Sequence, residues 1–143
     1  MPTNDVLTET IRARGHENVT AEHASTFEVT SDDFLTPAGD CIVGVEADRV
    51  PADFSSEFVE ACRRADATIT ASFDVEGLVE TVRGRGDPAL TFESERSLVF
   101  RTSEYVDERT VAVGMECAAA GLDRELIHRL TVGAPLTVTL AVE

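Results

Sequence analysis

Apolar and polar residues alternate along several short segments of this chain, which is the pattern of strands with one buried face. In the first half, the alternation predicts strands at residues 8–14, 19–30 and 68–75. Residues 41–47 are almost all apolar, which predicts a strand buried on both faces. A loop at residues 31–40 separates the second strand from the third.

One helix is expected between the third and fourth of these strands. Phe54 and Phe58 recur at helical spacing, and Asp53 and Ser55 are residues that cap helix N-termini. The helix should end near Ala65.

The same order of elements is predicted again in the second half. Residues 80–86 repeat residues 9–15, including the pattern Arg-x-Arg-Gly. The later blocks recur as well: 24–28 as 89–93, 43–46 as 113–116, and 67–76 as 134–143. A second helix is expected at about 123–131 and a last strand at 136–142, with an extra strand-like run at 97–101.

Two fused repeats predict a single domain over residues 1–143. The repeats cover about 7–77 and 78–143, and no linker rich in Gly, Ser or Pro separates them. One β-β-β-α-β repeat leaves open sheet edges, whereas two copies related by a pseudo-twofold axis can close a barrel. We therefore expect an α+β, β-rich fold: a duplicated β-barrel with two helices. Gly39-Asp40 before an apolar strand resembles the Gly-Asp box of cradle-loop barrels, which are also duplicated.

The charge composition changes what a partner could be. The chain has 27 acidic residues and 12 basic ones, all arginine, for a net charge of −15. A lysine-free acidic surface suits a cytoplasm with molar salt, where the screening length falls to ~3 Å. We therefore predict a cytoplasmic protein of a halophilic archaeon. In such a solvent, net charge does not exclude a nucleic-acid partner.

The remaining composition argues against several classes of protein. Cys41, Cys62 and Cys117 are widely spaced, so reduced thiols are expected and no zinc site. No apolar run is long enough to span a membrane, and no signal peptide opens the chain. No P-loop or dinucleotide glycine motif is present, so no cofactor is expected.

Four segments resemble an archaeal family of domains of unknown function, family 371. They are Arg14-Gly15-His16-Glu17-Asn18, residues 23–28, residues 35–45 and residues 84–92. The resemblance covers nearly the whole chain and implies an archaeal cytosolic protein. It implies no catalytic residue, because no activity is assigned to the family.

Polar residues found in only one repeat are candidates for function, because the duplicated scaffold does not require them. His23 lies on the apolar face of its predicted strand, and the sequence alignment places Pro88 opposite it. His16 is replaced by Asp87 in the second repeat, and Asp40 follows a loop found only in the first. These three are the candidate catalytic residues, as acid or base. Each is also explained as a core, cap or turn residue, and their spacing matches no metal-binding motif.

The arginines of the two Arg-x-Arg-Gly segments are the candidate ligand-binding residues. Alternation places Arg12 and Arg14 on one strand face, and Arg83 and Arg85 on another. A pseudo-twofold axis could bring the pairs together, with His16 beside them, to bind phosphate or carboxylate. Pairing with neighbouring carboxylates would explain them as well.

The sequence thus favours a binding module for an anionic ligand, such as a nucleotide or RNA. The alternatives are a small enzyme with a His/Asp acid-base site and a protein-interaction module. Whether the chain is an enzyme, and its oligomeric state, are left open.

Overall fold

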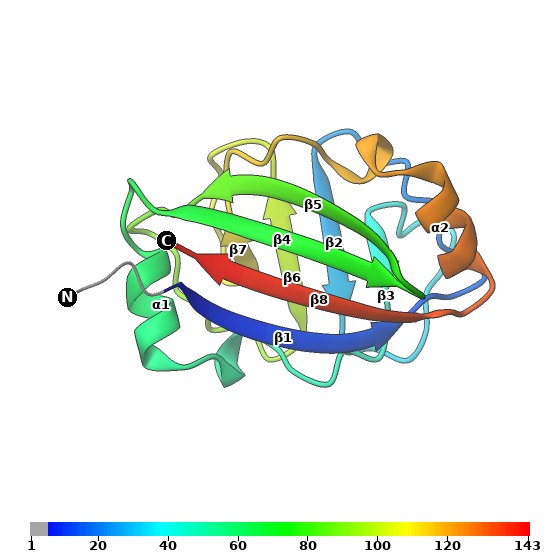
Figure 1. Ribbon diagram of the computed structural model, residues 1–143, viewed down its shortest axis with the longest axis horizontal. Coiled ribbons are helices and arrows are strands. Elements are labelled where there is room, and N and C mark those ends of the chain that lie inside the picture. Colours follow the sequence, from blue (N-terminus) through cyan, green and yellow to red (C-terminus); the bar gives the residue numbers. More distant parts are fainter. Residues whose placement is uncertain (1–5) are drawn as a thin grey trace.

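A computed structural model describes residues 6–143 of the chain, which form two four-stranded sheets and two α-helices (Figure 1). The first half contains β1 (Leu7–Arg14), β2 (Thr26–Thr30), β3 (Ile42–Gly44), η1 (Pro51–Asp53), α1 (Ser56–Cys62) and β4 (Thr68–Val75). The second half contains β5 (Leu78–Arg85), β6 (Ser97–Arg101), β7 (Thr110–Ala112), η2 (Ala119–Gly121), α2 (Arg124–Thr131) and β8 (Pro135–Val142). Each half thus has the order β-β-β-α-β, and the fold is mixed α+β and rich in strands.

The first sheet has the order β1-β8-β4-β5 and is antiparallel throughout. The second has the order β3-β2-β6-β7, in which β2 and β6 are antiparallel and each outer pair is parallel. The first sheet therefore joins strands from both ends of the chain.

Many backbone contacts of one half recur in the other. The N–H of Ala52 donates to the carbonyl of Ser94, and the N–H of Ala120 donates to the carbonyl of His23. Residues that make the same contact in the two halves are called counterparts below. Ser94 is thus the counterpart of His23.

The closed barrel that the sequence predicted is not found among residues 6–143. The two sheets meet instead at two isolated bridges, Arg14 with Val45 and Arg85 with Val113. The pairing between the sheets stops at each bridge because the next residue has a positive φ and turns the chain away. This residue is Glu46, with φ 57°, at the first bridge and Gly114, with φ 59°, at the second. The result is a sandwich.

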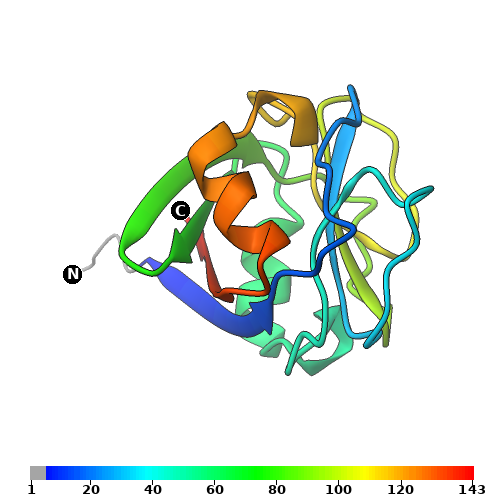
Figure 2. The ribbon, with the colours of Figure 1, turned by 90° about the vertical axis from the view of Figure 1, so that its right-hand side faces the viewer.

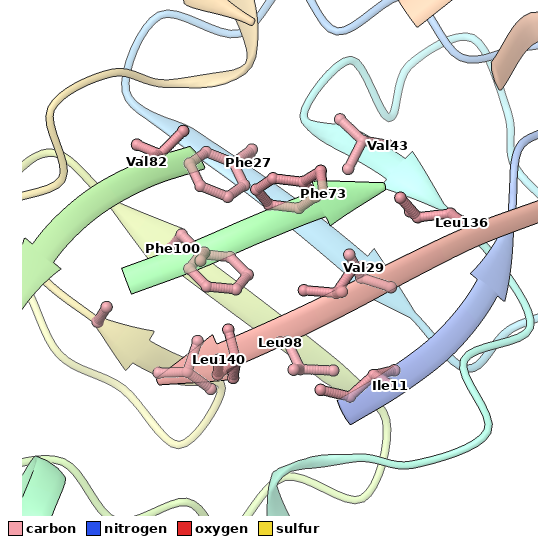
Figure 3. Packing of buried hydrophobic residues seen from close by; sticks show 14 of the residues in the cluster. Ile11, Phe27, Val29, Val43, Phe73, Val82, Leu98, Phe100, Leu136 and Leu140 are labelled. Carbon is pink, nitrogen blue, oxygen red and sulfur yellow. The ribbon is translucent and has the colours of Figure 1, made fainter. Parts of the chain in front are cut away.

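Apolar side chains from both sheets fill the space between them (Figure 3). At the centre, Phe27 stacks on Phe100 with 4.5 Å between ring centroids, and Phe73 meets Phe27 edge to face at 5.4 Å. All three rings are at most 1% exposed, so this trio is the centre of the core.

The two helices close the two ends of the sandwich, and Figure 2 shows α2 between the sheets. Ser55 caps α1 by accepting from the N–H of Phe58, and Asp123 caps α2 by accepting from the N–H of Glu125. The predicted helix starts were close, whereas α1 ends at Cys62, three residues before Ala65.

The glycine of each Arg-x-Arg-Gly segment lies against the end of a helix. A Cβ atom on Gly15 would lie 1.9 Å from the carbonyl oxygen of Leu130, and one on Gly86 would lie 2.1 Å from that of Cys62. Each glycine therefore allows the strand that precedes it to reach the helix of the other half.

Three predicted strands are wrong in extent. Residues 19–25 form a loop rather than the start of a strand, because Ala21 has a positive φ of 50° and the N–H groups of Glu22 and His23 bond to the carbonyl of Asp40. Residues 89–93 are not a strand either, and β6 takes the place of the strand predicted there. The apolar run at 41–47 keeps only its centre, Ile42–Gly44, as a strand.

Candidate functional site

The outer face of the first sheet has a charge composition unlike that of the whole chain. It consists of even residues 8–14 of β1, odd residues 135–141 of β8, even residues 68–74 of β4 and odd residues 79–85 of β5, and none of them is buried. We call it the arginine face. Its charged residues are Arg12, Arg14, Arg83, Arg85 and Asp74, so cations outnumber carboxylates there although the chain carries 27 acidic residues.

The four predicted arginines share this face but do not form one cluster. Arg14 pairs with Pro135 at one end of β1, and Arg85 pairs with Thr68 at the opposite end of β5. Because β1 and β5 are the two edges of the sheet, the arginine pairs occupy diagonal corners. Ideal strand geometry places the Cα atoms of Arg12 and Arg83 about 20 Å apart.

Hydroxyl groups occupy the centre of the arginine face. Thr10, Thr139, Ser72 and Thr81 stand in one row across all four strands, and the hydroxyls of Ser72 and Thr81 lie 3.3 Å apart. Neither helix lies over this row in Figure 1. The face is therefore open, polar and flat.

The corner arginines differ in how far their charges are neutralised. Arg14 donates to the carboxylate of Glu46, at 2.8 Å from Nε, and Arg85 lies 3.2 Å from that of Glu104. The hydrogen bond with Glu46 raises the pKa of Arg14, and the same bond lowers the pKa of Glu46, so both stay charged. Among residues 6–143, the exposed guanidinium groups of Arg12 and Arg83 make neither a hydrogen bond nor an ion pair.

His16 lies beside Arg14 in a cleft of about 490 Å³ at the end of α2. Glu17, Thr131, Val132 and Gly133 complete its lining. Nδ1 of His16 accepts a hydrogen bond from the N–H of Asn18, as Oδ1 of its counterpart Asp87 accepts one from Ala89. His16 is therefore a turn residue whose second nitrogen, Nε2, has no protein partner among the described residues.

His23 has a structural role that the sequence alignment concealed. Its Nδ1 accepts from the N–H groups of Ser25 and Thr26, both at 3.2 Å, and Oγ of its counterpart Ser94 accepts from the N–H groups of Arg96 and Ser97, both at 3.1 Å. The true counterpart is thus Ser94 and not Pro88. His23 lies in a loop and caps the chain as a serine does.

Asp40 contacts His23 only through the backbone. The carbonyl of Asp40 accepts from the N–H of His23, as the carbonyl of Glu108 accepts from that of Ser94. Within the described residues, no hydrogen bond joins the carboxylate of Asp40 to either imidazole. The acid-base role of His16, His23 and Asp40 therefore stays a prediction.

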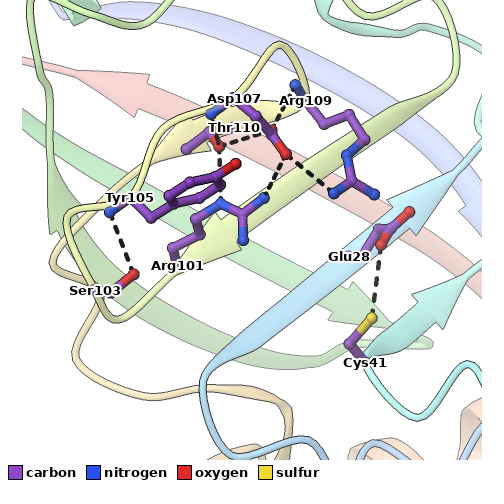
Figure 4. Close-up of polar contacts among 8 residues, drawn as sticks. All are labelled: Glu28, Cys41, Arg101, Ser103, Tyr105, Asp107, Arg109 and Thr110. Atoms are coloured by element: carbon purple, nitrogen blue, oxygen red, sulfur yellow. Dashed lines mark hydrogen bonds and ion pairs between the residues drawn. The ribbon is translucent and has the colours of Figure 1, made fainter.

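A charged cluster on the outer side of the second sheet was missed (Figure 4). Asp107 accepts from Arg101 at 2.9 Å, from Arg109 at 3.0 Å and from the hydroxyl of Thr110 at 3.1 Å, and the ring of Tyr105 lies over Arg101 at 4.8 Å. The counterparts of Arg101, Arg109 and Thr110 are Thr30, Cys41 and Ile42, which carry no charge at neutral pH. The extra length of the 94–109 loop was the available signal.

This cluster holds the β6–β7 loop and makes one pH-dependent contribution to stability. Partial burial acts to raise the pKa of Asp107, but hydrogen bonds from Arg109 and Thr110 and the charge of Arg101 outweigh it and lower that pKa from 3.8 to about 2. A folded pKa below the unfolded value stabilises the protein above about pH 4, and this stabilisation is lost as the pH falls from 4 to 2.

We expect Asp107→Asn to lower the free energy of unfolding by about 1–2 kcal/mol at pH 7. Urea unfolding of both proteins at pH 7, 4 and 2.5 measures the difference, which should shrink as the pH falls. A difference that stays constant down to pH 2.5 would contradict this assignment.

The described residues give little support for a thiol nucleophile, a metal site or a membrane-spanning helix. All three cysteines are free, and burial raises the pKa of Cys41 to about 11 and that of Cys62 to about 12, so neither is a nucleophilic thiolate at neutral pH. Residues 6–143 contain no group of three or more His, Cys, Asp or Glu side chains placed to hold a metal ion. Within the same residues, no helix is long and apolar enough to cross a membrane.

Comparison with known proteins identifies one family and one relative. A family model described as "Domain of unknown function (DUF371)" matches residues 11–143. The chain is 38% identical over 132 residues to "Uncharacterized protein MJ0206" from the archaeon Methanocaldococcus jannaschii, and the alignment covers 92% of this chain and 97% of that protein. The predicted family is thereby confirmed, whereas the halophilic origin stays a prediction.

Proposed function

We propose, for a chain that belongs to the DUF371 family, that the arginine face binds the phosphate backbone of single-stranded nucleic acid, RNA in particular. The observation that carries the proposal is the charge composition of this face: four arginines and one carboxylate in a chain of net charge −15. Arginine pairs with phosphate through two parallel hydrogen bonds, so it is well suited to this ligand.

The two free guanidinium groups are the primary contacts of this proposal. Arg12 and Arg83 are exposed, and among residues 6–143 their guanidinium groups form no ion pair, although Asp48 and Glu116 accept from their backbone N–H groups. Arg14 and Arg85 can contribute further, although Glu46 and Glu104 compete for them. Because Arg12 and Arg83 are about 20 Å apart, a nucleic-acid strand that contacts both must have several nucleotides between the two contacts.

The centre of the face supports binding to the backbone and not to the bases. The Thr and Ser hydroxyls between the arginine pairs can donate to phosphate oxygens or bond to ribose hydroxyls. No strand residue of the face is aromatic, so the base stacking common in single-strand binding is missing. We therefore expect binding with little sequence preference.

The test uses the whole protein and a fluorescently labelled 12-nucleotide oligouridine, with anisotropy measured over a series of KCl concentrations. Arg12→Ala/Arg83→Ala should weaken binding at least tenfold, and the slope of log K against log salt should become shallower by about 1.4, since each lost phosphate contact on a single strand contributes about 0.7.

The matched control removes two arginines outside the face. Arg96 pairs with Asp32 and Arg129 with Glu125, so Arg96→Ala/Arg129→Ala changes the net charge equally. This variant should bind within twofold of the unaltered protein. Equal losses in both double variants, or no binding by the unaltered protein at any salt concentration, would refute the proposal.

A further inference from the structure

The cleft beside Arg14 and His16 has a counterpart corner with different side chains. Thr131 follows Leu130 at the end of α2, and its counterpart Arg63 follows Cys62 at the end of α1. The guanidinium of Arg63 donates twice to the carbonyl of Pro88, at 3.3 and 3.1 Å, and so crosses the turn that follows Gly86. Thr131 is too short to cross the matching turn.

A second difference between the two corners is His16, whose counterpart is Asp87. Asp87 places a carboxylate at one corner, whereas His16 places an imidazole ring at the other. While Nδ1 of His16 accepts from Asn18, the ring proton lies on Nε2, which is therefore a hydrogen-bond donor. The Arg14 corner thus lacks the guanidinium that crosses the turn at its counterpart, and its carboxylate stands one position later, on Glu17, where the counterpart has Pro88.

Arg14 retains donors for a ligand in this cleft. A guanidinium has five N–H groups, and three of those of Arg14 are used: two by Glu46 and one by the carbonyl of Gly15. Two N–H groups remain, together with Nε2–H of His16. Glu17 on the rim opposes an anion, so the ligand must carry enough charge to outweigh it.

We infer that this cleft binds the terminal phosphate of the nucleic-acid strand that crosses the arginine face. A phosphate monoester carries a charge of −1.5 to −2 at pH 7 and has three acceptor oxygens, more than an internal diester offers. The cleft shares Arg14 with the face and lies beyond the last residue of β1, where a bound strand would end. This inference rests on the proposed function and adds to it a preference for phosphorylated ends.

The test compares three labelled oligouridines of equal length: one with a 5′ phosphate, one with a 3′ phosphate and one with neither. The unaltered protein should bind one phosphorylated oligonucleotide about tenfold more tightly than the unphosphorylated one, and the two arms show which end is bound. His16→Asp installs the counterpart residue, so it is compatible with the local backbone, and it replaces the Nε2–H donor with a carboxylate. It should reduce the preference to less than twofold.

Asp87→His at the counterpart corner is the control and should leave the preference unchanged, because Arg63 still crosses that turn. Thermal unfolding followed by circular dichroism verifies that every variant is folded. Equal binding of all three oligonucleotides by the unaltered protein would overturn this inference and leave the proposed function standing. A preference that survives in His16→Asp would also overturn it. If no oligonucleotide binds, the proposed function fails and this inference fails with it.

Discussion

Replacing Phe27 with alanine is expected to lower the free energy of unfolding by about 4 kcal/mol, because deleting a buried aromatic ring leaves a cavity. Phe27 is fully buried and contacts both Phe100 and Phe73, so the loss affects the whole aromatic centre of the core. Urea unfolding followed by circular dichroism at constant salt concentration measures the change.

Phe27→Leu is the matched control. The counterpart of Phe27 in the second half is Leu98, which is also fully buried. The fold therefore already accommodates a leucine at the equivalent position. The cost should be about 1 kcal/mol, as for a conservative change of core volume. If alanine and leucine destabilised equally, the aromatic trio would not be the centre of stability described above.

Gly15→Ala should cost about 3 kcal/mol or prevent folding, because the new methyl group must displace the backbone of a helix end. The nearest atom, the carbonyl oxygen of Leu130, would lie 1.9 Å from the Cβ, and it belongs to the backbone of α2. Soluble yield and the midpoint of thermal unfolding report the effect.

Gly39→Ala is the comparison for that variant. Its Cβ would first meet Cδ1 of Leu35 at 2.8 Å, and the end of a leucine side chain can move aside. We expect a cost below about 1 kcal/mol. Equal costs at Gly15 and Gly39 would mean that the strand does not need its close approach to α2.

The order and class of the elements could be predicted from the sequence, because each strand and helix carries its own periodicity. The predicted N-cap Ser55 begins α1, the helix expected at about 123–131 is α2, and the alternating segment at 68–75 is β4. The closed barrel was wrong because closure depends on single backbone conformations. Glu46, a non-glycine residue with a positive φ, carries no sequence signal for the turn it makes.

The candidate site was predicted in part. Alternation correctly assigned Arg12 and Arg14 to one face, and the same holds for Arg83 and Arg85. Their separation could not be read from the sequence, because it depends on β8 and β4 lying between β1 and β5. The assignment of His23 failed for a related reason: residues 24–28 match 89–93 in letters, whereas the fold places β6 opposite β2.

The pairing of β1 with β8 has a consequence for how the chain acquires its structure. Leu7 pairs with Val142, so the first strand lies beside the last one. During synthesis, β1 has no neighbour in its sheet until β8 has left the ribosome. Closing so long a loop costs entropy before any contact forms, which makes folding of this sheet slow. Neither half can therefore form this sheet without the other.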